Sequence, residues 1–168
     1  MALAGAASAA PSGVVTISGT TQSKIELTLA DDTASFGTTM TPDGDPSGGE
    51  STLAGTAAAG ACYAWAGTAT VRSNVTYRVG VNGSGSLSRV GFLTAAPATY
   101  AACTGGMAVS TAMFPAAVPP TAFVINQTAT TSRAHNFWLG LSVGWTDPTG
   151  NINPAPAVSL TLTAAVYP

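Results

Sequence analysis

Charged side chains are scarce in this chain. Its 168 residues include five Lys and Arg, seven Asp and Glu, and a single His, so only 7% are charged, against about 25% in an ordinary soluble domain. Because acid–base and nucleophilic catalysis depend on titratable groups, this composition disfavours an enzyme. The one imidazole, His135, has no G-x-S-x-G nucleophile motif to serve. We expect it to be a strand-entry residue beside Arg133.

Other absences remove further classes of function. The net charge is −2 and the five basic residues are scattered, whereas binding to a nucleic-acid backbone needs clustered Lys and Arg. No run of 18 apolar residues predicts a membrane-spanning helix. One His and two distant Cys do not supply a tetrahedral zinc site. We therefore expect no cofactor, no nucleic-acid partner and no membrane-spanning segment.

Apolar and hydroxyl residues make up for the missing charge. The hydrophobic fraction is 46%, which is normal for a folded domain and unlike a disordered chain. Stretches such as 158–162 alternate apolar and hydroxyl side chains, the pattern of a strand with one buried face. The length predicts one domain, over residues 13–168.

Alternation of this kind recurs along the chain. It predicts strands over 15–18, 24–29, 68–72, 75–81, 87–93, 121–126, 135–146 and 157–167. Residues 40–51 form a surface loop, and Asn82-Gly83 is typical of a hairpin turn. In 135–146 one face is expected in the core, with the residues Phe137, Leu139, Leu141, Val143 and Trp145. Seven to nine strands without βαβ alternation predict an all-β fold, an antiparallel sandwich or barrel.

Two stretches are less regular. Residues 53–66 are rich in Ala, but Gly55 and Gly60 interrupt them, and glycine costs about 1 kcal/mol in a helix interior. Loop and strand are therefore favoured over helix. Residues 94–120 are rich in proline and small residues and predict a long excursion, pinned by Cys103 and containing a short strand around 107–113.

Two cysteines, Cys62 and Cys103, predict one disulfide, because an extracellular composition accompanies an even count. The alternative is a pair of buried free thiols. A bridge between them closes a loop of about forty residues, which the chain-entropy model values at about 4 kcal/mol at most.

The first twelve residues are rich in Ala and end shortly after Pro11. They resemble the tail of a signal peptide but lack a basic segment and a long apolar core. We expect residues 1–12 to form an N-terminal arm held by a neighbouring subunit, with a first strand continuing to about residue 18.

Several short motifs resemble secreted immunoglobulin-like surface domains. They are Ile25-x-Leu27-x-Leu29, Phe36-Gly37, Pro42-x-Gly44, Ser73-Asn74, Tyr77-x-Val79-x-Val81 and the closing segment 159–164. The resemblance covers most of residues 14–168 and implies an immunoglobulin-like β-sandwich. With the arm, the chain looks like a pilin-type subunit of prokaryotic surface filaments, in which one protomer's N-terminal strand completes the next protomer's sheet.

The favoured function is therefore that of a structural subunit that polymerises outside the cell or on its surface. The candidate assembly residues are Leu3, Val14, Val15, Ile17 and Trp138. Trp138 is expected on the face opposite the core, where an exposed Trp is typical of an interface. The alternatives are an adhesin or carbohydrate-binding module that takes a surface or glycan ligand, and a virion or surface-layer protein.

The sequence offers three further candidate sites. Asp43, Asp45 and Glu50 lie in a Gly-rich loop and offer oxygen ligands for calcium, although their spacing fits no EF-hand and a solvated turn is favoured. Glu26 and Glu50, the only glutamates, do not form a glycosidase pair, because Glu26 is expected to point outward. Asn74, Asn82 and Asn126 head N-x-[ST] sequons and are candidate glycosylation sites.

Overall fold

The fold comes from a computed structural model that describes residues 18–37, 40–44, 50–84, 87–104, 107–109, 124–147 and 159–167. The predicted assembly residues Leu3, Val14, Val15 and Ile17, and the candidate calcium ligand Asp45, lie outside these ranges.

Nearly all the regular structure is antiparallel β. The strands are β1 (Ile25–Leu29), β2 (Thr52–Ala57), β3 (Gly60–Ser73), β4 (Tyr77–Ser84), β5 (Leu87–Leu93), β6 (Met107–Val109), β7 (Val124–Gln127), β8 (Thr130–Gly144) and β9 (Ser159–Val166), with one short helix, α1 (Tyr100–Thr104). They form two packed sheets, so the prediction of an antiparallel β-sandwich is confirmed.

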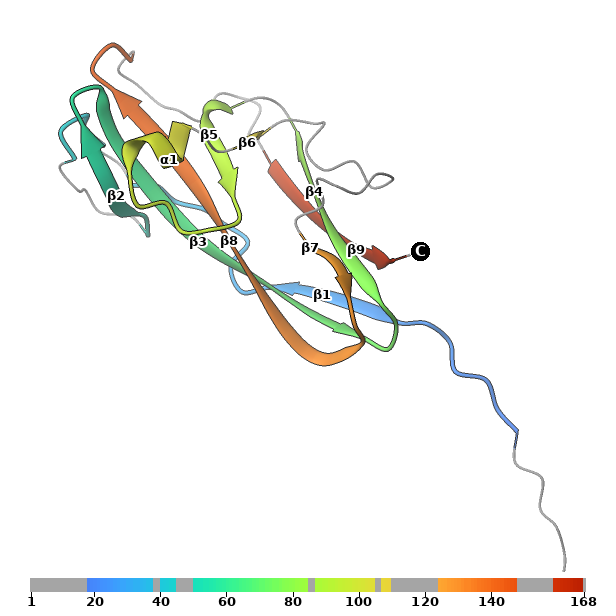
Figure 1. Cartoon of the computed structure of the whole chain (residues 1–168). Coiled ribbons are helices and arrows are strands. Elements are labelled where there is room, and N and C mark those ends of the chain that lie inside the picture. The colour runs from blue at the N-terminus through green and yellow to red at the C-terminus, as the bar shows by residue number, and fades with distance from the viewer. Residues whose placement is uncertain are drawn as a thin grey trace, which may run out of the picture.

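The larger sheet is built around two long strands. β3 and β8 pair from Gly60 opposite Gly144 to Ser73 opposite Thr130, a span of about 40 Å at about 3.3 Å per residue. β1 pairs with the last part of β3 and β2 with its first part, while β5 and then β6 extend the sheet beyond β8. The smaller sheet has the order β7-β4-β9. The sandwich is therefore elongated along β3 (Figure 1).

We name the two ends of this long axis. The far end carries the β2–β3 turn and the turn at Trp145–Asp147 that follows β8. The arm end carries the turn at Asn74 between β3 and β4, and residues 18–24, which lead to β1 (Figure 1).

The core between the sheets is aromatic toward the far end. Tyr63, Trp65, Phe92 and Phe137 belong to its main cluster, and the rings of Phe92 and Phe137 stack with centroids 5.5 Å apart. Gly67 makes room for them, because a Cβ there would lie 2.4 Å from Phe137 Cζ. A second, smaller cluster of buried residues, Val71, Tyr77 and Val79, fills the arm end.

Helix α1 covers the outer face of the larger sheet at the far end (Figure 1). It carries Cys103, which forms a buried disulfide with Cys62 of β3, as predicted. Gly140 of β8 seats the helix, since a Cβ at this position would meet Cys103 Sγ at 2.9 Å. The helix was not predicted, but the short strand in 107–113 is confirmed as β6.

Two sequence predictions are wrong. Trp145 is 61% exposed rather than in the core, because β8 ends at Gly144 and the chain turns, with Asp147 N donating to Gly144 O. Asn82-Gly83 is not a hairpin turn. Both residues lie in β4, paired with β9, and β4 and β5 belong to different sheets because the chain crosses between them.

Candidate functional site

The chain that leads from the N-terminus into the sandwich is exposed. Residues 18–24 are all exposed and run away from the body at the arm end (Figure 1). Asn74 fixes the point where they join it: its Nδ2 donates to Gln22 O, and its Oδ1 accepts from Lys24 N, both at 2.7 Å. The side chain of Asn74 therefore clamps the main chain of residues 22–24, which we call the arm root.

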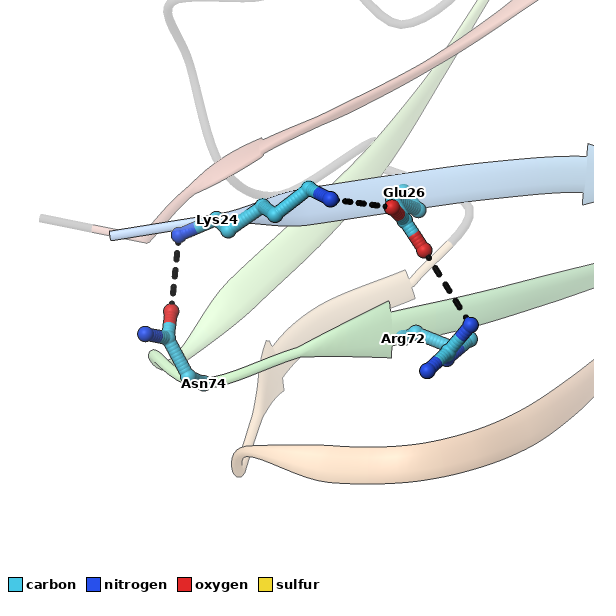
Figure 2. Close-up of polar contacts among 4 residues, drawn as sticks. All are labelled: Lys24, Glu26, Arg72 and Asn74. Atoms are coloured by element: carbon cyan, nitrogen blue, oxygen red, sulfur yellow. Dashed lines mark hydrogen bonds and ion pairs between the residues drawn. The ribbon is translucent and has the colours of Figure 1, made fainter. Parts of the chain in front are cut away.

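A charged triad lies beside this clamp (Figure 2). Glu26 accepts from Lys24 Nζ at 2.6 Å and lies 3.4 Å from Arg72 Nη1, with all three side chains more than 40% exposed. The hydrogen bond from Lys24, and then the charges of Lys24 and Arg72, lower the pKa of Glu26. Pairs this exposed add little to stability, so the triad mainly orients its three side chains. Glu26 points outward, as predicted.

The triad forms one wall of a shallow, polar hollow of about 560 Å³ on the outer face of the larger sheet. Its lining residues come from β1, the end of β3 and the start of β8: Lys24, Glu26, Arg72, Ser73, Asn74, Ala129, Thr130 and Thr131. The hollow thus brings together charged and amide donors, one carboxylate and several hydroxyl groups. It lies at the arm end, beyond the part of the sheet that α1 covers.

One flank of the sandwich is open in the described residues. β1, an edge of the larger sheet, lies against β9, an edge of the smaller one. In the described part of the chain, β9 is hydrogen-bonded only to β4, so no described strand pairs with its other edge. Ile25 and Leu27 of β1, and Leu162 and Ala164 of β9, pack on the core but stay only partly buried. The core therefore reaches the surface along this flank.

A polar contact joins the two sheets near the arm end. Tyr77 Oη of β4 lies 2.8 Å from His135 Nε2 of β8, and Tyr77 is fully buried. Burial, then the charge of Arg133, lower the pKa of His135. Arg133 in turn donates to Gln127 Oε1 at 2.6 Å. His135 lies inside β8 rather than at a strand entry, and its contact with the Tyr77 hydroxyl links the two sheets.

Two of the three candidate calcium ligands, Asp43 and Glu50, lie in the described residues. Among the residues that the structure describes, no group of three or more His, Cys, Asp or Glu could hold a metal ion. Glu50 Oε2 accepts from Trp65 Nε1 at 3.1 Å. Asp43 lies in the turn closed by Gly44 N donating to Thr41 O, and the calcium site stays a prediction.

The three sequons differ in their surroundings. Asn74 uses both polar atoms of its amide to clamp the arm root, so a glycan there would replace the clamp. Asn126 is exposed at the end of β7 with a φ of 49°, a conformation that Asn tolerates. The backbone of Asn82 lies within β4. Glycosylation stays a prediction, and Asn126 is the most open candidate among the described side chains.

Trp138 is half-buried on β8, where it pairs across the sheet with Ala66 and Leu93. Its role in assembly stays a prediction. The sequence did not reveal the clamp by Asn74 or the contact of Tyr77 with His135. For the clamp, the only sequence signal was the position of Ser73-Asn74 between two strand patterns. The contact between Tyr77 and His135 joins residues 58 apart, and no local sequence pattern indicates it.

None of the described helices is long and apolar enough to span a membrane. A comparison with protein-family models, curated proteins and solved structures finds no match for this chain. The resemblance to pilin-type immunoglobulin-like domains therefore stays a prediction.

Proposed function

We propose that this protein is the structural subunit of an extracellular filament, and that it polymerises by donating its N-terminal strand to a sheet edge of the neighbouring subunit. One observation carries the proposal: an exposed segment, residues 18–24, leads away from a sandwich whose β1–β9 flank leaves core side chains partly uncovered. In the proposal, the exposed segment leads to the donor strand that precedes it, and the flank is the acceptor.

The edge of β9 is the acceptor that fits best. A strand added there would extend the order β7-β4-β9 by one and would cover Leu162 and Ala164 together with Ile25 and Leu27 of β1. Main-chain hydrogen bonds to an open edge supply affinity, and alternate side chains supply register. Val15 and Ile17 are spaced by two and provide the apolar face that such a strand turns toward the core.

Composition and covalent structure favour the same reading. A net charge of −2 on 168 residues gives little repulsion between copies. The buried Cys62–Cys103 disulfide is typical of proteins that work in an oxidising, extracellular compartment. Secretion and display at the cell surface are therefore part of the proposal.

Electron microscopy of the purified chain tests it. We expect fibres from the wild type, and none from the variant Val15→Asp/Ile17→Asp, because a carboxylate cannot enter an apolar groove without a large desolvation cost. The matched control is Thr16→Asp, which places the same charge on the opposite face of the donor strand and should still polymerise.

The proposal fails if the wild type stays monomeric under all conditions, or if the double variant polymerises as well as the control does. Leu162→Lys tests the acceptor separately. It should block polymerisation while its thermal unfolding stays cooperative.

A second function is favoured by the polar hollow. Arg72, Lys24, Glu26 and the nearby threonines offer the donors and acceptors that a surface sugar would need. Binding of the wild type, but not of Arg72→Ala, on a glycan array would favour an adhesin. An array without any signal would remove this candidate.

A further inference from the structure

The guanidinium of Arg72 is only partly used within the protein. Its side chain is 69% exposed, and in the described residues its one ion pair joins Nη1 to Glu26 Oε2 at 3.4 Å. That distance is long for a charge-assisted hydrogen bond, which measures about 2.7–2.9 Å. Figure 2 shows one end of the guanidinium turned toward Glu26 while the other end points away from it. Arg72 therefore keeps most of its N–H donors available to a ligand.

Glu26 is committed to its other neighbour. Its carboxylate accepts from Lys24 Nζ at 2.6 Å, and the main chain of Lys24 is itself held, because its N donates to Asn74 Oδ1. The hydrogen bond from Lys24 is the first cause of the lowered pKa of Glu26, whereas Arg72 lowers that pKa through its charge alone. The carboxylate thus binds Lys24 firmly and Arg72 loosely.

The hollow beside these residues carries one net positive charge. Two cations and one carboxylate line it, and its other lining residues are uncharged. The start of β8 adds the hydroxyl groups of Thr130 and Thr131, and Thr131 is exposed. Hydroxyl groups both donate and accept hydrogen bonds, so the hollow combines a cationic fork with neutral polar partners.

These groups define the chemistry of a ligand. The planar fork of an Arg matches two oxygens of an anionic group, and one net positive charge is balanced by a single such group. The ammonium and the hydroxyls match the hydroxyl groups of a sugar ring. The volume of about 560 Å³ lies within the range of small-molecule sites.

From this arrangement we infer that the hollow binds an acidic sugar, whose carboxylate or sulfate pairs with Arg72 and whose ring hydroxyls bond to Lys24 and to the threonines at the start of β8. The inference rests on the second candidate function, surface-sugar binding, and names its ligand class. It does not depend on strand donation. Because Arg72 and Lys24 are exposed, salt should weaken the binding.

Saturation-transfer difference NMR with the full chain tests the ligand class, because it observes the sugar and works with monomers and fibres alike. Glucuronic acid and glucose differ at C6, where only the former carries a carboxylate, so the wild type should bind glucuronic acid about tenfold more tightly or better. Acetate offers the charge without the ring and should bind about tenfold more weakly than glucuronic acid. Glucose 6-sulfate, compared with glucuronic acid, shows which anionic group is preferred.

Variants place the binding at the hollow. Arg72→Ala should lower the affinity for glucuronic acid by about tenfold or more, and Arg72→Lys nearly as much, because it keeps the charge but loses the fork. The matched control is Arg78→Ala. It removes the same charge from β4 in the smaller sheet, outside the lining of the hollow, so the affinity should stay within about twofold. Thermal unfolding verifies that each variant is folded.

The outcomes separate this inference from the filament. Equal binding of glucuronic acid and glucose, or no binding of either acidic sugar, would overturn the inference. So would acetate that binds as tightly as glucuronic acid, or a loss in Arg78→Ala as large as that in Arg72→Ala. A wild type that binds glucuronic acid through Arg72 but forms no fibres would support the acidic-sugar site and reject the filament. Fibres without sugar binding would do the reverse.

Discussion

The two halves of β3 differ in how their side chains are buried. Residues 60–65 are buried without interruption, whereas 66–73 alternate between buried and more exposed positions. At the far end, α1 and the disulfide cover the outer face of the larger sheet. Both faces of β3 are therefore shielded from solvent there. At the arm end the outer face carries Arg72 and the polar hollow instead.

The two halves are also held together by different interactions. The far half has stacked aromatic rings and a covalent bridge. The arm half has a small aliphatic cluster, the contact of Tyr77 with His135, and the clamp by Asn74. The far half is therefore held by aromatic packing and a covalent bond, whereas the arm half depends more on polar contacts.

The largest expected effect comes from the disulfide. Reducing Cys62–Cys103, or replacing both residues with Ala, should lower the free energy of unfolding by about 4 kcal/mol, because the unfolded chain regains the entropy of an open loop. Chemical unfolding with and without reductant measures this. The Ala variant must not respond to reductant, and an unchanged midpoint in the reduced wild type would contradict the prediction.

Adding bulk under α1 should have the next largest effect. Gly140→Val should cost about 2 kcal/mol, because its side chain would meet Cys103 and Leu93, and overpacking a filled site costs about 1–3 kcal/mol. Gly144→Ala is the control, since its Cβ would find no atom nearer than 3.3 Å. Equal losses in thermal stability for both variants would show that α1 does not pack closely on β8.

At the arm end, Tyr77→Phe removes the hydroxyl that links the sheets. It should cost about 1 kcal/mol, because His135 Nε2 is left without this buried partner. Tyr63→Phe is the matched comparison, since it removes the bonds of a buried hydroxyl to Thr41. Hydrogen exchange should show a wider loss of protection in the first variant and a loss limited to the Thr41 loop in the second.

Asn74→Ala should have a smaller and local effect of about 0.5 kcal/mol, since two exposed hydrogen bonds to main-chain groups are lost. Exchange of the Lys24 amide should quicken, while the core of β3 keeps its protection. Global destabilisation equal to that of Tyr77→Phe would mean that the clamp holds the sandwich and not only the arm root.

The smallest effect concerns pH. Since the pKa of His135 is lowered in the folded chain, both states are neutral above its ordinary value of about 6.5. As the pH falls through that value, the unfolded chain binds the proton first, so stability decreases until the folded pKa is reached. His135→Gln should flatten this part of the curve of unfolding free energy against pH. A wild-type curve that rises on acidification would contradict the prediction.

How far the sequence predicts this fold depends on which faces are covered. Strands with one solvent-facing side, such as β1, β4 and β9, alternate apolar and polar residues in the sequence. They were predicted within a few residues of their bounds. The start of β3 was not predicted as a definite strand. Because α1 covers its outer face, the residues there are Ala and Cys instead of polar residues, and the alternation is lost. Trp145 was misplaced because alternation says nothing about where a strand stops.

The candidate site shows the same division. The alternation of Val15 and Ile17 with polar residues and the pair of cysteines can be read directly from the chain. The unpaired edge of β9 and the clamp by Asn74 cannot, because they depend on which segments become neighbours.

By itself, then, the amino-acid sequence determined a β-rich, disulfide-linked chain with little charge, because composition and period-two alternation are local properties. Only the tertiary structure decided that α1 covers the far half, that β9 ends the smaller sheet in the described residues, and that Lys24, Glu26, Arg72 and Asn74 meet at the arm end. Those features depend on pairing between residues far apart in the chain, which hydrogen bonding and packing select together and which no short stretch of sequence specifies.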